Sequence, residues 1–287
     1  MDNTKQTIAI TGGASGIGKA IAVKFGRENF NIAIGDIEVP ALEETIQELN
    51  ELGIETLGVP IDVSDLSSME NFAKETEDTF GPVSIVCLNA GVGAGGETWD
   101  IPISDWEWVL SVNLWGVING LKVFLPGMKE RDSGHLVFTS SVAGHLSYPR
   151  MGPYNASKHA VLTIAETLYH ELAEGQSGLG VSALCPGLVR TRILDSARNK
   201  PESLTDLPIE PTDQEQEIRE AIVREIYDQA LEPEHVANLV YSAVNEKKFY
   251  IFTDNSFTDA LKNRHRNIEK AQNPTLNANL IEEHLND

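Results

Sequence analysis

The sequence has few cysteines, little positive charge and no long apolar run. Its two cysteines, Cys87 and Cys185, each lie in an apolar segment, so we interpret them as small buried residues. The seven histidines show no metal-ligand spacing, and no bound metal is expected. Lys and Arg number 22 against 43 Asp and Glu, a formal net charge of -21. Such an excess repels phosphate backbones, so nucleic-acid binding is not expected.

The N-terminal residues and the hydropathy pattern indicate a soluble, cytoplasmic protein. The chain passes from MDNTK directly into the apolar alternation QTIAITGG, which leaves no room for a signal sequence. No later run of about 18 apolar residues predicts a membrane span. Since 41% of the residues are hydrophobic and 23% are charged, the composition is that of an ordinary globular domain.

Apolar runs of strand length alternate with segments of helical period. The runs are nearly continuous, which is typical of strands covered by helices on both faces of a parallel sheet. This order predicts an α/β fold with a doubly wound, mostly parallel, seven-stranded sheet in a single domain. The expected strands are 7–11, 31–36, 56–63, 83–89, 135–141, 181–187 and 249–254.

Two later helices are also expected. Ser104 and Glu107 fit a capping box at the start of a helix that runs toward Pro126. A second helix starts near Tyr154, where apolar residues keep a spacing of three and four.

A glycine-rich loop, TGGASGIG, joins the first strand to the first helix and is a candidate phosphate cradle. In this context Gly12 allows the tight turn, Gly16 lets backbone N–H groups approach a pyrophosphate, and Gly18 permits close helix packing. Ser15 and Ile17 belong to the same loop, and the helix N-terminus adds a partial positive charge.

Asp36 supplies a second signal, because it ends the second strand eighteen residues after Gly18. A carboxylate at this position accepts hydrogen bonds from a ribose 2′-hydroxyl and repels a 2′-phosphate. Neither Ser15, Ile37 nor Glu38 offers the cation that a phosphorylated ribose needs. NAD is therefore favoured over NADP. The alternative is that Asp36 only caps a turn.

Tyr154 and Lys158 are four residues apart in YNASK, which places them on one face of a helix. An ammonium within about 4 to 6 Å lowers the pKa of an acid by about 1 to 3 units. The lysine can thus make the phenol a proton acceptor from an alcohol or a donor to a carbonyl.

Five motifs in this order, TGGASGIG, LNAG at 88–91, SS at 140–141, YNASK and PGLVRT at 186–191, resemble the short-chain dehydrogenase/reductase family. The resemblance covers about residues 6–254. It implies a Rossmann-type domain, a nicotinamide cofactor, and hydride transfer between that cofactor and an alcohol or carbonyl carbon.

The resemblance also implies roles for individual residues. Tyr154 matches the family's acid/base, Lys158 the group that lowers its pKa and holds the nicotinamide ribose, and Ser141 the serine that binds the substrate oxygen. Asn113 matches a residue that positions a water linking Lys158 to solvent. Further cofactor contacts are implied for Asp62, Val63, Asn89, Ala90, Gly91, Pro186, Gly187, Val189 and Thr191, and the chain departs from the usual pattern at Leu88.

The remaining segments have weaker interpretations. The acidic segment of about 188–231 corresponds to the family's substrate lid, within a catalytic domain of residues 1–254, and 255–287 is expected to form a helical tail. Loop residues are expected to make the pocket partly aromatic and apolar: Trp99, His145, Leu146, Tyr148 and Met151.

These features predict an NAD-dependent dehydrogenase of a secondary alcohol, reversible to the ketone. In length, lid and tail the chain is similar to bacterial dehydrogenases of aromatic or benzylic alcohols. The family implies a homo-oligomer, either a tetramer or a dimer. The alternatives are a 3-oxoacyl carrier-protein reductase and a catalytically silent, NAD-sensing regulatory protein.

Overall fold

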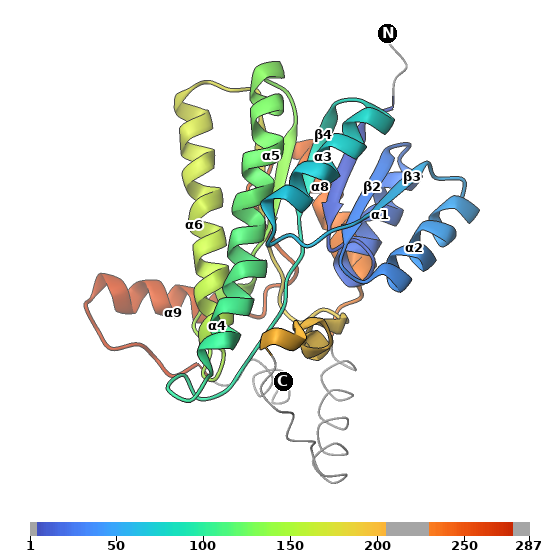
Figure 1. Cartoon of the computed structure of the whole chain (residues 1–287). Helices are drawn as coiled ribbons and strands as arrows, with labels where there is room; N and C mark the ends of the chain where they lie inside the picture. The colour runs from blue at the N-terminus through green and yellow to red at the C-terminus, as the bar shows by residue number, and fades with distance from the viewer. Residues whose placement is uncertain (1–4, 205–229, 278–287) are drawn as a thin grey trace.

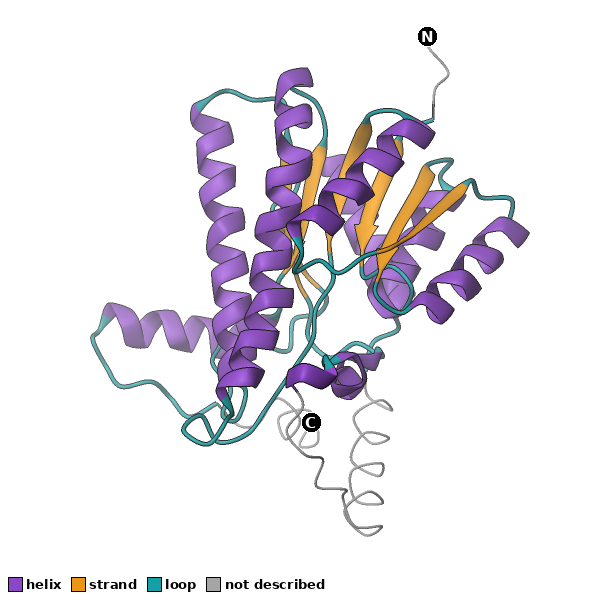
Figure 2. Cartoon of the chain, viewed as in Figure 1, coloured by secondary structure: helices purple, strands orange, loops and turns teal. Residues whose placement is uncertain are grey.

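A central parallel sheet organises the chain. The computed structural model describes residues 5–204 and 230–277. Seven strands pair in the order β3-β2-β1-β4-β5-β6-β7, and every described pair is parallel (Figures 1 and 2). The doubly wound prediction is confirmed, with a sheet that is wholly parallel. The strands are β1 (Thr7–Thr11), β2 (Asn31–Asp36), β3 (Thr56–Pro60), β4 (Val83–Leu88), β5 (His135–Thr139), β6 (Gly180–Cys185) and β7 (Tyr250–Phe252).

Helices cover both faces of the sheet. In β1, Ile8 and Ile10 belong to the core cluster on one face, while Ala9 belongs to the cluster on the other. This alternation follows from the two-residue period of a strand, and it gives each face its own apolar layer. One face carries α1 (Gly16–Arg27), α2 (Val39–Glu51) and α8 (Pro233–Glu246), and the other carries α3 (Leu66–Phe80), α5 (Gly116–Arg131) and α6 (Gly152–Glu174).

The helix expected from the capping box begins differently from the prediction. Pro102 is the N-cap of α4 (Ile103–Leu110) and makes no side-chain cap bond, so Ser104 lies inside the first turn. The chain continues through a π-helical turn, η1 (Ser111–Trp115), into α5. Pro126 lies within α5 rather than at its end. Because Pro126 and Lys122 are both exposed, water can bind the Lys122 carbonyl that a proline leaves without its partner.

The combined helical stretch of residues 103–131 is long and apolar enough, by length and composition alone, to cross a membrane. Its most apolar window is 44% buried inside the structure. Val117 and Phe124 of α5 pack into the core cluster on one face of the sheet, so α5 contributes to the core of the domain.

Short helical segments complete the carboxyl edge of the sheet. The segment after β6 forms η3 (Arg192–Asn199) and η4 (Glu202–Leu204), and most of the predicted acidic lid, residues 205–229, lies outside the described residues. After β5 comes η2 (Val142–Gly144), and after β7 comes α9 (Thr258–Glu269), the helix expected in the tail. Figure 1 shows α9 projecting beside the lower ends of α4 and α6.

Candidate active site

A cavity of about 670 Å³ opens at the carboxyl edge of the sheet. Its walls come from the glycine-rich loop, the ends of β2, β4, β5 and β6, the start of α6, and η3. Most of the predicted site residues line it, although Gly18 and Asn113 lie behind its wall. Those that line it are Gly12, Ser15, Gly16, Ile17, Asp36, Asp62, Val63, Asn89, Ala90, Gly91, Ser141, Tyr154, Lys158, Pro186, Gly187, Val189 and Thr191.

The glycine-rich loop requires glycine at three positions. Gly12 and Gly16 have φ values of +64° and +51°, which disfavour other residues. A Cβ on Gly16 would lie 2.9 Å from Cγ2 of Thr191, across the cavity mouth. A Cβ on Gly18 would lie 2.1 Å from the Gly12 carbonyl oxygen, so the packing role predicted for Gly18 fits the geometry.

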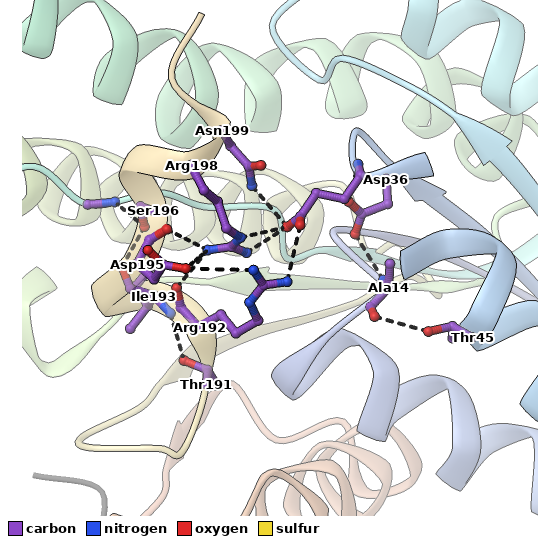
Figure 3. Close-up of polar contacts among 12 residues, drawn as sticks. Ala14, Asp36, Thr45, Thr191, Arg192, Ile193, Asp195, Ser196, Arg198 and Asn199 are labelled. Carbon is purple, nitrogen blue, oxygen red and sulfur yellow. Dashed lines mark hydrogen bonds and ion pairs between the residues drawn. The ribbon is translucent and has the colours of Figure 1, made fainter. Parts of the chain in front are cut away.

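Asp36 lies at the end of β2 with a buried carboxylate. Its Oδ2 accepts a hydrogen bond of 2.9 Å from the Ala14 N–H, and its Oδ1 accepts one of 3.0 Å from the Glu38 N–H (Figure 3). Burial raises the pKa of Asp36 above its ordinary value, although these hydrogen bonds oppose the shift. The carboxylate thus ties the glycine-rich loop to the turn after β2.

Asn89 joins β4 to the glycine-rich loop. Its Nδ2 donates to the carbonyl oxygens of Thr11 and Gly12, at 3.2 and 3.0 Å. The unusual Leu88 is a buried core residue and leaves these bonds intact. On the next wall, Asp62 accepts hydrogen bonds from the N–H and hydroxyl of Ser64, which fixes the turn after β3.

The Tyr154 phenol and the Lys158 ammonium reach the same end of the cavity from α6. Lys158 is buried, and its Nζ lies 5.5 Å from the centroid of the Tyr154 ring. The ammonium donates a 2.9 Å hydrogen bond to the Thr139 carbonyl oxygen at the end of β5. Ser141, just beyond β5, accepts a 3.1 Å hydrogen bond from the Ala143 N–H.

The pKa values differ from the sequence-based expectation. Burial raises the pKa of Tyr154, and a hydrogen bond from Ser141 only partly offsets it, so the expected lowering by Lys158 is not found here. Burial lowers the pKa of Lys158 to about 8. Lys158 does not lower the pKa of Tyr154 in this structure because its ammonium donates to the Thr139 carbonyl rather than to the phenol oxygen.

Asn113 lies in the π-helical turn η1 and is almost fully buried. Its Oδ1 accepts from the Val92 N–H at 2.8 Å, and its Nδ2 donates to the Val92 carbonyl and the Ser157 hydroxyl. Such turns often occur at functional sites because they re-aim one side chain. Asn113 holds the loop after β4 against α6, and its water-positioning role stays a prediction.

The expected pocket lining is only partly correct. Met151 lines the cavity, but Leu146 and Tyr148 are buried in a separate core cluster around Phe257. His145 does not line the cavity either, and its Nε2 lies 3.4 Å from the Sγ of Cys185 at the end of β6. Trp99 is 79% exposed. Besides Tyr154, the cavity lining includes the aromatic side chain of Trp108 of α4, whose helical position gave no signal of this.

An unexpected group of charged side chains closes the other end of the cavity. Glu38, in the turn after β2, binds Arg192, Arg198 and Asn199 of η3. Figure 3 shows these three η3 side chains extending toward the turn that follows Asp36. The partners are separated by more than 150 residues, so no local sequence pattern could have indicated them.

The segment after β6 is also anchored at two other points. Lys200 pairs with Asp105 of α4 at 2.6 Å, and both side chains are mostly buried. Nearer the tyrosine, the Ser196 Oγ accepts a 3.0 Å hydrogen bond from the Gly93 N–H. Residues 192–200 after β6 are therefore held by contacts with the turn after β2, the loop after β4 and α4.

Comparison with known proteins supports the family suggested by the motifs. A model of the short chain dehydrogenase family matches residues 6–202. The chain belongs to this family. A short-chain dehydrogenase/reductase from Burkholderia phymatum, solved in complex with NAD, is 38% identical and superposes with a TM-score of 0.89, over 96% of this chain and 98% of that one. The family membership makes this chain an oxidoreductase with a Rossmann-like domain.

Two enzymes show the range of the family's substrates. A C alpha-dehydrogenase from a Sphingobium species is 32% identical over 87% of this chain and 81% of its own length. A diacetyl reductase that forms (S)-acetoin, from Staphylococcus epidermidis, is 31% identical over 88% of this chain and 97% of its own length. Both act as dehydrogenases or reductases, so the family defines the reaction class more closely than the substrate.

Proposed function

We propose that this protein is an NAD-dependent dehydrogenase of secondary alcohols that also reduces the corresponding ketones. The observation that supports this most directly is one cavity with two chemically different ends. Tyr154, Lys158 and Ser141 line one end, while Asp36 and the glycine-rich loop line the other. The NAD complex of the Burkholderia phymatum relative, which covers nearly the whole chain, supports the same cofactor.

The residues of the adenosine end fit a dinucleotide. Gly12 and Gly16 line the cavity with backbone at positive φ, so the loop presents backbone rather than side chains to a pyrophosphate. Ser15, the N-cap of α1, makes no side-chain cap bond, so the N–H groups of the first turn can bind phosphate oxygens. The Asp36 carboxylate can accept hydrogen bonds from the adenosine ribose. When bound, NAD supplies the hydride acceptor of the reaction.

The chemistry at the other end depends on proton transfer by Tyr154. The Ser141 hydroxyl orients the substrate oxygen, and the Tyr154 phenol donates a proton to a carbonyl or, once ionised, accepts one from an alcohol. Its raised pKa keeps the phenol protonated at neutral pH in this structure, which suits the reducing direction. Lys158, with a pKa of about 8, is mostly cationic at pH 7 and would stabilise a phenolate beside it.

The substrate end of the cavity favours an uncharged compound with an apolar body. Its lining includes Val92, Trp108, Met151 and Leu204. The similarity to bacterial dehydrogenases of aromatic or benzylic alcohols in length, lid and tail favours such an alcohol, whereas the diacetyl reductase relative supports a small diketone. We favour the aromatic alcohol because the lining includes the aromatic side chain of Trp108, against which another ring can pack.

A panel of secondary alcohols with NAD and NADP tests this proposal, using the absorbance of the reduced cofactor as the signal. We expect benzylic secondary alcohols to give the highest kcat/KM with NAD. Faster oxidation of acetoin would favour the small-diketone substrate instead. NADH binding without turnover of any alcohol or ketone would support the silent regulatory protein.

The assembly and location of the protein are further parts of the proposal. We propose a cytoplasmic homo-oligomer, a tetramer or dimer, built on the apolar outer surface of the helices near Trp115 and Tyr169, which are both exposed here. A monomeric mass in light scattering at micromolar concentration would contradict the oligomer.

A further inference from the structure

The side chain of Glu38 is surrounded by cationic and amide donors from the lid. It accepts four hydrogen bonds: from Arg198 Nε at 3.1 Å, Arg198 Nη2 at 2.6 Å, Asn199 Nδ2 at 3.1 Å and Arg192 Nη1 at 3.2 Å. The side chains of Glu38 and Arg198 are each only 20% exposed. Although burial alone would raise the pKa of Glu38, these donors hold it below its ordinary value, so the carboxylate is ionised near neutral pH.

This charged group lies beside the carboxylate that is expected to bind the adenosine ribose. Asp36 is two residues before Glu38 and accepts a hydrogen bond from its N–H. Asp36, Glu38, Arg192 and Arg198 all line the same cavity. The turn after β2 contains no cation of its own, but the fold brings two guanidinium groups to it from the segment after β6.

We propose that Arg192 and Arg198 form a latent binding site for a ribose 2′-phosphate, and that Glu38 masks this site and so helps to determine the preference for NAD over NADP. The inference rests on the proposed function, since it concerns the cofactor of that same cavity. It adds a specificity residue beyond Asp36.

The charge balance explains the masking. Three carboxylates, those of Asp36, Glu38 and Asp195, lie around two guanidinium groups in this corner, so the formal charge is -1 and becomes zero once Glu38 is neutralised. An additional phosphate would meet arginines whose donors are already occupied by Glu38. Without the Glu38 charge, the same guanidinium groups could bind a phosphate through two parallel hydrogen bonds.

Arg198 is held in place independently of Glu38. Its Nη1 donates to the backbone carbonyl oxygens of Arg192 and Asp195, at 2.9 and 2.7 Å (Figure 3). Removing the carboxylate of Glu38 therefore leaves the Arg198 guanidinium near its present position, with two N–H groups released toward the cavity.

A purely structural role for Glu38 makes a different prediction. If these ion pairs only fastened the lid, their loss would weaken NADH and NADPH binding by the same factor. The ratio of the two dissociation constants separates the possibilities, because loosening of the lid cancels in that ratio.

The first experiment measures this ratio in the full-length protein by calorimetric titration with NADH and NADPH. In Glu38→Gln we expect affinity for NADPH relative to NADH to rise at least tenfold over the wild type. Glu44→Gln is the matched control, because Glu44 is exposed on α2 and does not line the cavity. An unchanged ratio in Glu38→Gln, or an equal rise in Glu44→Gln, would overturn the proposal.

The second experiment tests whether the arginines produce the effect. The gain in the ratio should disappear in the double variant Glu38→Gln/Arg198→Gln and fall in Glu38→Gln/Arg192→Gln. A gain in the ratio that persists in the triple variant Glu38→Gln/Arg192→Gln/Arg198→Gln would contradict the latent site. Glu38→Ser should reproduce the rise if Glu38→Gln folds poorly. Failure of the wild type to bind NADH would instead overturn the proposed function, which is a separate result.

Discussion

The two ends of the cavity are built from different kinds of contact. At the end proposed to be catalytic, Tyr154 and Lys158 come from one turn of α6, and Ser141 lies thirteen residues before Tyr154, just after β5. At the adenosine end, the carboxylate of Glu38 binds Arg198 across 160 residues of sequence. The comparison teaches that a short motif can specify the reaction, while the surroundings of the cofactor depend on segments that meet only in the folded chain.

A second buried base shows why a perturbed pKa does not by itself identify a site. His135 is the first residue of β5, at the end of the strand away from the cavity, and burial lowers its pKa to about 4. Its Nε2 is 2.8 Å from the Ser182 hydroxyl, which donates to the Lys248 carbonyl. His135 does not line the cavity that contains Lys158. Lys158 and His135 are buried to the same extent, and the difference is that Lys158 lines the cavity.

The largest expected effect tests the catalytic end. Tyr154→Phe removes the proton donor, so we expect kcat for alcohol oxidation to fall by about 10² to 10⁴-fold. NADH binding should change little, because the adenosine end is intact. Tyr241→Phe, at a position on α8 that does not line the cavity, is the control. Near wild-type turnover in Tyr154→Phe would show that the tyrosine is not the acid/base.

The next effect concerns stability away from both ends of the cavity. The pKa of His135 is about 4 in the folded chain and about 6.5 when unfolded, so its stabilising contribution is complete above pH 6.5 and is lost as the pH falls toward 4. The loss amounts to at most about 3 kcal/mol.

Urea unfolding of His135→Gln at several pH values checks this prediction. We expect the variant to lose less stability than the wild type between pH 6.5 and 4, with unchanged turnover at pH 7.5. His170→Gln, at an exposed position on α6, should keep the wild-type pH dependence. A steeper loss in His135→Gln would contradict the assignment of a neutral, buried histidine.

The smallest effect tests the ion pair that anchors the segment after β6 to α4. Lys200→Met breaks the ion pair with Asp105, so we expect KM for the alcohol to rise about threefold, which corresponds to about 0.7 kcal/mol, while kcat with saturating alcohol changes less. Lys262→Met, which breaks an exposed pair on α9, is the control. Steady-state kinetics that show a fall in kcat alone would indicate a different role for Lys200.

Local patterns predicted most of the sheet and the glycine-rich loop. The seven strands begin within one residue of their expected positions, because continuous apolar runs and intervening helical periods are local properties. The helix through Pro126 was harder to predict, because a proline ends a helix in some surroundings and continues it in others, and here both Pro126 and Lys122 are exposed. The prediction that Tyr148 lines the pocket was wrong, because an aromatic residue in a loop can pack into the core as easily as toward a cavity.

The sequence by itself determined the order of the elements, the spacing of Tyr154 and Lys158, and the acidic residue that ends β2. Periodicity and short separations along one helix or turn are sufficient for these features. Only the tertiary structure decided that Lys158 donates to the Thr139 carbonyl and that Glu38 meets Arg192 and Arg198. Burial and ion pairing depend on which distant segments are brought together, and the parallel sheet does this by gathering its carboxyl ends at one edge.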